Sequence, residues 1–347
     1  MRIPCESHRR WTTLRRLLLC AALASLGAGV ESAHAQAQAA APARPLGRQL
    51  PAAAQVVLAH EDSFAGDRRV GTYVSSSSGF STASYWIEGP TGLILIDTQF
   101  LLSAAEEAVS WAEQATGKKA ELAIVLHANP DKFNGTAILK KRGIRVVTSA
   151  QVRALMPAIH EQRVRSFYER YKPDYPKELT LPDSFGDKTT ELSAGGVTVK
   201  AHVLGPGCSD AHVAVEFDGH LFAGDLVAAG SHSWLELGHT DQWLQRIDEL
   251  WALSPRFVHP GRGPSGDRRL LRQQEEYLKN VIALVAAEHP RARSVLAGEK
   301  LDAAGEAAVE RIKNRLGERY FGYRFDVFLD IGVPAEFRRQ ALAAAKR

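Results

Sequence analysis

Residues 122–135 read LAIVLHANPDKFNG, an apolar run that leads straight into chemically active side chains. The five apolar residues Leu122 to Leu126 predict a strand that is covered on both faces. His127 and Asp131 follow in a loop that ends at Asn134-Gly135. Loops at strand ends, held by a rigid sheet, are where catalytic and binding groups collect. The stretch therefore predicts a functional site directly after a buried strand.

The patterns along the rest of the chain form two strand-rich halves on either side of a long polar helix, Ala150–Tyr171. Each half offers a sheet with helices on its outer face, which predicts an α+β fold, a four-layer αββα sandwich with a helical C-terminal extension. The predicted strands are Val70–Ser75, Ser84–Glu88, Leu93–Asp97, Leu122–Leu126, Arg145–Thr148, Thr190–Leu192, Val197–Leu204, His212–Phe217, Leu221–Ala223 and Phe257–Val258. The other predicted helices are Ala104–Ala115, Phe133–Lys141, Asp241–Leu253, Asp267–His289, Ala303–Arg319 and Ala335–Lys346.

The N-terminus reads as a secretory signal, residues 1–35. A basic start precedes the short apolar run Leu17–Val30, and Ala33-His34-Ala35 forms a small-x-small cleavage site. The run is too short for a permanent membrane helix, so we expect Sec-type export to the periplasm or outside the cell and no stable membrane anchor after cleavage. Residues 36–55 are then a flexible linker, residues 56–289 the main domain and residues 290–347 the helical extension.

Composition excludes several classes of protein. With 45% hydrophobic and 24% charged residues, the 347-residue chain is neither disordered nor collagen-like. The leader's five arginines and two glutamates account for three of the four excess positive charges. A mature net charge of +1 gives no electrostatic support for binding nucleic acid. Cys5 and Cys20 also leave with the leader, so Cys208 is the one thiol of the mature chain.

Two further groups of loop residues follow predicted strands. Residues 205–212 read GPGCSDAH, and residues 221–226 read LFAGDL, with HPGRGP further on at residues 259–264. The order and spacing of these motifs, together with residues 85–90 (YWIEGP) and 95–98 (LIDT), resemble the metallo-β-lactamase superfamily over about residues 70–285. The resemblance implies the αββα fold and hydrolysis of a small ester, amide or lactam by metal-activated water.

The resemblance also implies a metal site, which this sequence matches only in part. The family binds two zinc ions through a His-x-His-x-Asp-His loop, a third His, a bridging Asp and a last His. His127, Asp131 and Asp225 stand at matching positions, and Asp131 is the candidate catalytic residue. The substituted positions are Asn129, Lys132, Cys208 and Arg262.

Two interpretations of these substitutions remain open. A thiolate is a good zinc ligand, so His127, Cys208 and Asp225, with Asp131 nearby, are candidates to hold a single zinc ion. Arginine has no lone pair to donate and lysine must first lose a proton, so the second metal position is lost. Such a protein is a hydrolase with at most one zinc.

The alternative is a metal-free, non-catalytic relative. Asp131 and Asp225 without metal would be costly buried charges, and Lys132 and Arg262 supply two positive charges at the former ligand positions. We therefore expect a cluster of salt bridges in place of the metal cluster. The cleft would then bind a small-molecule ligand or a partner, and the oligomeric state stays open.

Cys208 has three interpretations: a packed small residue, a zinc ligand or, least in keeping with its surroundings, a nucleophile. His212 and His259 lie outside the family's ligand register, and we expect structural roles for both. His232 and His239 follow Asp225 in a region that borders the cleft, where they are candidate replacement ligands or substrate contacts.

Overall fold

The computed structural model describes residues 55–58, 67–296 and 300–344, all within the unit Pro45–Arg347. The predicted leader and all but the last residue of the predicted linker lie outside the described residues. Among the described helices, none is both long and apolar enough to cross a membrane.

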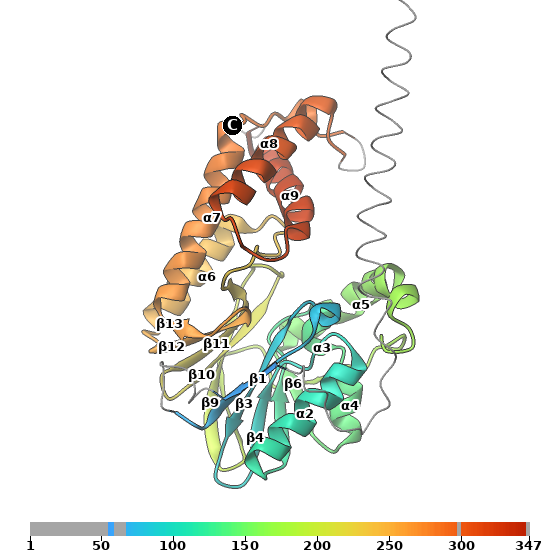
Figure 1. Cartoon of the computed structure of the whole chain (residues 1–347), viewed down its shortest axis with the longest axis vertical. Coiled ribbons are helices and arrows are strands. Elements are labelled where there is room, and N and C mark those ends of the chain that lie inside the picture. Colours follow the sequence, from blue (N-terminus) through green and yellow to red (C-terminus); the bar gives the residue numbers. More distant parts are fainter. Residues whose placement is uncertain (1–54, 59–66, 297–299, 345–347) are drawn as a thin grey trace, which may run out of the picture. The chain divides into compact units, whose positions relative to one another are not determined.

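The first sheet has the strand order β1-β2-β3-β4-β5-β6-β7 (Figure 1). Strands β1 to β4 pair antiparallel, and β4 to β7 pair parallel. Strand β4 (LILI) is a continuous buried apolar run, and β5 is buried and apolar from Leu122 onward, because helices and a second sheet cover both faces. The bounds are β1 Gln55–Leu58, β2 Val70–Val74, β3 Ala83–Glu88, β4 Leu93–Ile96, β5 Ala120–Ile124, β6 Arg145–Thr148 and β7 Asp183–Ser184.

The second sheet has the order β13-β12-β11-β10-β9-β8. Its strands pair antiparallel except for β11 and β12, which run parallel and so bring their carboxyl ends to one edge. The bounds are β8 Thr190–Ala194, β9 Val197–Leu204, β10 His212–Phe217, β11 His220–Ala228, β12 Phe257–Arg262 and β13 Gly266–Asp267.

Helices lie on the outer faces of both sheets, as Figure 1 shows. Helices α2 and α4 pack on the first sheet, and α6 and α7 on the second. Between the sheets, Tyr85 of β3 packs on Phe222 of β11 with ring centroids 5.4 Å apart, and its hydroxyl donates to the Pro260 carbonyl at 2.6 Å. The predicted four-layer arrangement is confirmed. The helix bounds are α2 Leu102–Thr116, α3 Pro130–Phe133, α4 Thr136–Lys141, α5 Ala150–Tyr171, α6 Thr240–Ala252, α7 Arg269–Ala287, α8 Ala303–Arg319 and α9 Val327–Ala344.

Some boundaries differ from the prediction. Strands β11 and β12 run several residues further than expected, since parallel pairing holds their Gly- and Asp-containing ends in the sheet despite poor strand propensity. Helix α9 begins eight residues before the predicted Ala335 and contains Pro334. The buried side chains of Leu329 and Val333 belong to the core, and their packing outweighs the hydrogen bond that the proline cannot make.

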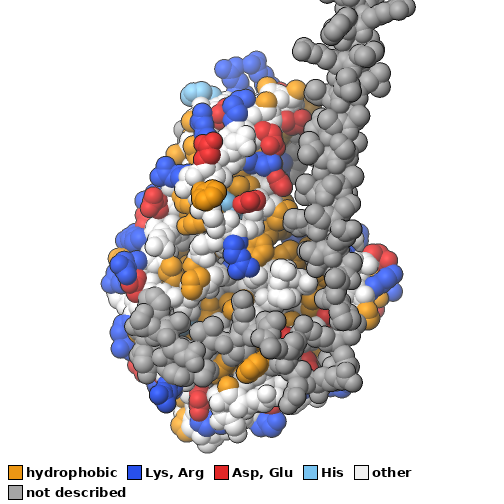
Figure 2. Space-filling model, in the orientation of Figure 1, with side chains coloured by type: hydrophobic (Ala, Val, Ile, Leu, Met, Phe, Trp, Pro, Cys, Tyr) orange, Lys and Arg blue, Asp and Glu red, His pale blue; other side chains and the backbone are white. Residues whose placement is uncertain are grey.

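The C-terminal helices α8 and α9 share a hydrophobic core with α6 and α7. Ile312 and Leu316 of α8 are fully buried, as is Val333 of α9. On their outer surface, acidic and basic side chains intermingle in the view of Figure 2. The segment that leads into α9 lies beside the loop that follows β11, where Arg324 forms an isolated bridge with Ser231.

Candidate functional site

The candidate site forms where the two sheets meet at their loop-bearing edges. The Val213 N–H donates to the Leu126 carbonyl at 2.6 Å, and His127 forms an isolated bridge with His212. These contacts fix the end of β5 beside the start of β10. The loop after β5 therefore faces residues of the second sheet, which supplies Asp225 from β11 and Arg262 from the end of β12.

Four charged side chains, which we call the ion cluster, occupy this edge: Asp131, Lys132, Asp225 and Arg262. The Lys132 ammonium is fully buried and lies 3.1 Å from Asp131 and 2.9 Å from Asp225. The Arg262 guanidinium donates to Asp225 at 2.7 Å and to Asp131 at 2.8 Å. Each cation thus bridges both carboxylates, and the predicted salt bridges are present.

The two cations keep the two carboxylates ionised. Burial raises the pKa of Asp225, but Arg262 and Lys132 outweigh it and hold that pKa well below its ordinary value. The same balance lowers the pKa of Asp131. Burial lowers the pKa of Lys132, yet the neighbouring carboxylates, Asp131 first, hold it above the ordinary value. The cluster therefore consists of four charged groups.

Asp97 is a fifth member of this neighbourhood, and the sequence analysis did not select it. Its carboxylate lies 3.9 Å from the Lys132 ammonium and accepts the Leu126 N–H at 2.9 Å. Burial raises the pKa of Asp97 to about 8, against the lowering effect of Lys132. Asp97 is therefore largely protonated at neutral pH, and the two cations are balanced by Asp131 and Asp225 alone.

Close packing at the cluster requires a glycine. A Cβ atom on Gly261 would come within 1.8 Å of Asp225 Oδ1. Any other residue would push the carboxylate away from both cations. The glycine of the HPGRGP stretch thus lets the backbone of β12 pass directly beside the site.

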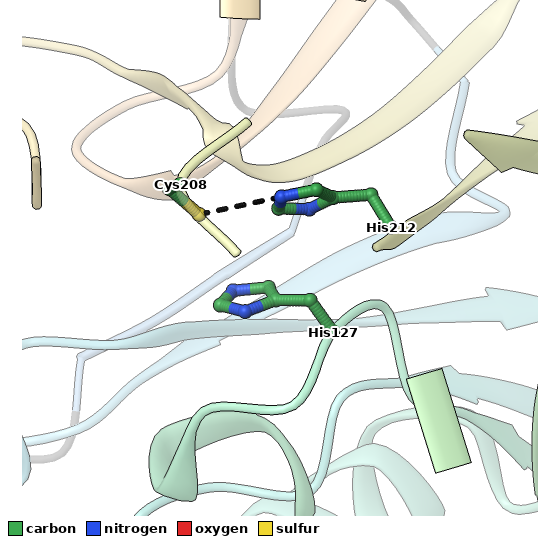
Figure 3. A group of neighbouring side chains, drawn as sticks. All are labelled: His127, Cys208 and His212. Atoms are coloured by element: carbon green, nitrogen blue, oxygen red, sulfur yellow. Dashed lines mark hydrogen bonds between the residues drawn. The ribbon is translucent and has the colours of Figure 1, made fainter. Parts of the chain in front are cut away.

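A second group, which we call the soft-donor group, lies next to the cluster and consists of His127, Cys208 and His212 (Figure 3). The ligand atoms of these buried side chains all lie within 4.8 Å of one another. Cys208 Sγ lies 3.7 Å from His212 Nε2, and His127 Nε2 lies 3.5 Å from Asp225 Oδ2. The group therefore touches the ion cluster through Asp225.

The two groups differ in how well they fit a metal. Ammonium and guanidinium groups have no lone pair to donate, so the ion cluster does not fit a metal ion. In the soft-donor group, both ring nitrogens of His127 are buried without a hydrogen-bond partner. A thiol with two imidazoles suits a single zinc ion.

Two features of the soft-donor group oppose metal binding. His212 Nε2 accepts the Ser209 N–H at 3.0 Å, which uses the lone pair that a metal needs. Burial holds the pKa of Cys208 well above its ordinary value, so the sulfur is a thiol and must lose its proton to ligate. The group fits one ion only if both features change on binding.

The structure gathers most of the predicted site residues. His212, for which a structural role was expected, lies in the soft-donor group and accepts the Ser209 N–H. The signal was its i, i+4 spacing from Cys208 in GPGCSDAH. His232 bonds to Tyr277 at 3.0 Å, and His239 to Asp210 at 2.7 Å. Neither belongs to the soft-donor group.

His259 lies apart from both groups, in a buried hydrogen-bonded chain. Its ring contacts His220 at 2.9 Å and Ser265 at 2.8 Å. Burial holds the pKa of His259 well below its ordinary value, so the ring is neutral. These contacts give it the structural surroundings that the sequence analysis expected.

A small cleft lies over the ion cluster, and five of its eleven lining residues are aromatic. Its volume is about 40 Å³. Asn129 lies in its wall, so this substituted position faces the cleft. The lining residues are Phe80, Phe100, Asn129, Pro130, Asp131, Arg163, Phe167, Asp225, Trp234, Arg262 and Phe328.

Comparisons with known proteins agree with this geometry. The sequence pattern of the metallo-β-lactamase superfamily matches residues 78–262. A type 2 metallo-β-lactamase of Bacillus cereus is 25% identical over 199 residues, which cover 54% of this chain and 69% of that protein. One of Bacillus sp. (strain 170) is 24% identical over 198 residues, with the same coverage. The crystal structure of the DIM-1 metallo-β-lactamase superposes with a TM-score of 0.51 at 16% identity, covering 65% of this chain and 97% of that one.

Proposed function

This chain belongs to the metallo-β-lactamase superfamily, and we propose that it is a metal-free member that binds a small ligand in its cleft instead of hydrolysing it. The fold is that of hydrolases, and the protein is hydrolase-like in this sense. The proposal concerns what the site does in this member. It is carried by one observation, the position of Lys132.

Lys132 places a permanent positive charge between the two carboxylates. Its buried ammonium lies within 3.1 Å of both Asp131 and Asp225, and Arg262 reaches the same two groups. A dication at this position would meet two fixed cations at short range, with little water to screen the repulsion. The charge balance that metal ions provide in the family is supplied here by side chains.

Asp131, the candidate catalytic residue, is engaged in the same way. Its Oδ2 atom accepts from Arg262 at 2.8 Å and from Thr82 at 3.2 Å, and lies 3.1 Å from the Lys132 ammonium. A general base needs a free lone pair and a pKa near the working pH. Asp131 has three donors around one oxygen and a lowered pKa, which favours a structural role.

A second candidate function rests on the soft-donor group. His127, Cys208 and His212 would hold the single zinc ion of a mono-zinc hydrolase, with Asp225 alongside. A zinc ion supplies Lewis-acid polarisation of a substrate carbonyl. The unpartnered nitrogens of His127 favour this candidate, while the hydrogen bond from Ser209 to His212 opposes it.

Elemental analysis of the native protein separates the two functions. We expect protein purified from the periplasm to contain no stoichiometric zinc. We also expect it not to hydrolyse a chromogenic ester or cephalosporin. The Cys208→Ala variant is then expected to be indistinguishable in metal content. Stoichiometric zinc that chelators remove slowly, lost together with activity in Cys208→Ala, would instead establish the second candidate. Hydrolysis at a rate that EDTA leaves unchanged would contradict both candidate functions.

We propose export to the periplasm or outside the cell on the basis of residues 1–35. Fractionation of expressing cells, followed by N-terminal sequencing, tests this proposal. We expect a mature chain that begins at Gln36, after Ala33-His34-Ala35. Protein retained in the cytoplasm with residues 1–35 attached would contradict it.

A further inference from the structure

The C-terminal helix reaches into the cleft over the ion cluster. Phe328, in the first turn of α9, lines the cleft and is 3% exposed. Its ring meets the Trp234 ring edge-on with centroids 4.9 Å apart, and stacks on Phe325 at 5.0 Å. The Arg262 guanidinium carbon lies 5.4 Å from its ring centroid. The first turn of α9 thus places an aromatic ring directly against the ion cluster.

Residues 322–328, which we call the strap, lead this ring into position. The Arg324 N–H donates to the Gly230 carbonyl at 3.1 Å, and its carbonyl accepts the His232 N–H at 2.9 Å. The Arg324 guanidinium donates to Ser81, the neighbour of the cleft residue Phe80. Asp326 of the strap also lies 3.4 Å from His232 Nε2. The strap is therefore held beside the cleft by backbone and side-chain contacts, most of them made by Arg324.

Two residues of the strap have backbone φ angles in the positive range, and one of them is not a glycine. Phe325 has a φ of 65°, in the left-handed region that bulky residues rarely adopt, and Gly322 has a φ of 86°. Strain of this kind persists only where surrounding contacts hold it. Release of Arg324 and Phe328 from their contacts would relieve the strain at Phe325.

With Phe328 in place, the cleft has no room for a ligand. The remaining volume of about 40 Å³ is far below the roughly 300–1,000 Å³ of pockets that bind small molecules. Five of the ten other lining residues are apolar, and both arginines among the rest are already engaged. Arg262 donates to Asp131, Asp225 and the Phe80 carbonyl, and Arg163 donates to Glu236. What fits the space vacated by Phe328 is therefore a flat apolar ring rather than a charged group.

We propose that the strap is a built-in occupant of the cleft, and that the protein's ligand carries a flat apolar ring that displaces Phe328. The inference rests on the proposed function, because it assumes that this cleft is the binding site. Binding then selects the open arrangement of the strap, and the closed arrangement lowers the apparent affinity. The strap acts as an autoinhibitory contact.

The Phe328→Ala variant tests this with 4-fluorotoluene as the probe, followed by the line width of its fluorine NMR signal. We expect Phe328→Ala to bind the probe on the order of ten-fold more tightly than the wild type, because an emptied apolar space accepts an aromatic ring. Phe321→Ala is the matched control, since Phe321 belongs to the same extension and is 93% exposed. It should bind as the wild type does. Equal affinities for all three proteins would overturn the proposal.

A measurement on the wild-type protein covers the case in which Phe328→Ala does not fold. Hydrogen–deuterium exchange of the strap should accelerate at saturating 4-fluorotoluene, because the Arg324 N–H loses its partner, while exchange within α8 stays unchanged. Unchanged exchange in the strap would contradict displacement. Metal content is measured on the same samples. Zinc in the protein would overturn the proposed function, whereas zinc-free protein with a static strap would overturn this inference alone.

Discussion

The ion cluster and the soft-donor group lie side by side and meet at Asp225, yet one is held together by ion pairs and the other is not. In the cluster, each carboxylate contacts both Lys132 and Arg262. In the soft-donor group, both nitrogens of His127 and Nδ1 of His212 are buried without a hydrogen-bond partner. Both groups stand at or beside positions where the family holds metal.

The difference follows from what a missing metal leaves behind. An unpaired buried charge costs several kcal/mol, and removing one partner of a buried ion pair costs about 3–5 kcal/mol. An unsatisfied neutral polar group costs only about 1–3 kcal/mol. Buried carboxylates at an empty metal position therefore need cations beside them, whereas an uncharged polar group without a hydrogen-bond partner is tolerated more easily.

The largest expected effect comes from replacing the two cations of the ion cluster with residues that can bind metal. The double variant Lys132→His/Arg262→His replaces both cations with imidazoles, beside Asp131 and Asp225. Two imidazoles and two carboxylates form a donor set that zinc accepts, so we expect about one zinc ion per chain after incubation with zinc. Elemental analysis after gel filtration gives the result. The control Lys140→His changes an exposed lysine on α4, and zinc uptake equal to that of the double variant would show that the cluster is not responsible.

Removal of one cation tests the cost of an uncompensated charge. Lys132→Ala leaves Asp131 and Asp225 with Arg262 alone, and we expect the free energy of unfolding to fall by about 3–5 kcal/mol. Lys140→Ala removes a lysine whose partner Asp183 is 66% exposed, so the loss should be below about 1 kcal/mol. Urea unfolding of both variants provides the comparison. Similar losses in the two would mean that the buried pair has no special role.

Asp97 gives the cluster a pH dependence with a definite sign. The folded pKa of about 8 lies above the ordinary value of 3.8, so the folded state holds this proton more tightly than the unfolded state. The contribution of Asp97 to stability is fully present below the unfolded pKa and is lost as pH rises towards 8. Asp97→Asn cannot ionise. Its stability relative to the wild type should rise with pH by up to about 1.4 kcal/mol per unit between pH 5 and 7.

Urea unfolding at three pH values in that interval tests the Asp97 prediction. Asp183→Asn, on the protein surface, controls for the loss of a carboxylate as such. If the Asp97→Asn and wild-type stabilities run parallel over the interval, Asp97 is ionised in the folded protein. The account of the cluster as two cations balanced by two anions would then be wrong.

The smallest effect is expected in the soft-donor group. Cys208→Ala removes one buried sulfur from a neutral environment, and we expect a loss of about 1 kcal/mol in the free energy of unfolding. Added zinc should shift the melting temperature of the wild type and of Cys208→Ala equally. A zinc-induced rise in melting temperature that occurs only in the wild type would show that the soft-donor group binds metal. The proposed function would then be wrong for this group.

The ion pairs of the cluster could be predicted from the sequence, because buried carboxylates that no metal balances need positively charged side chains beside them. Lys132 and Arg262 stand at ligand positions beside two carboxylates, and the pairing follows without coordinates. Asp97 and His212 were not identified as site residues. Asp97 lies far from Lys132 in sequence, and His212 meets His127 only through a bridge between the two sheets. Such contacts depend on how the sheets face each other.

Phe328 was missed for a different reason. The C-terminal helices carry no motif, and a phenylalanine in an amphipathic region reads as part of a core. Its place in the cleft depends on the start of α9, which was predicted eight residues too late, at Ala335. The error in this helix boundary therefore concealed Phe328. Among the described residues, it is the one residue of the extension that lines the cleft.

The buried ammonium of Lys132 has one further consequence. A metal ion is held by mass action, so a metal-dependent fold weakens when the surroundings are poor in that metal. The cation of Lys132 is covalently attached to the chain and is fully enclosed. It is not diluted, exchanged for another ion or taken by a competing chelator. If the proposed function holds, the charge balance at this site does not depend on the concentration of free zinc.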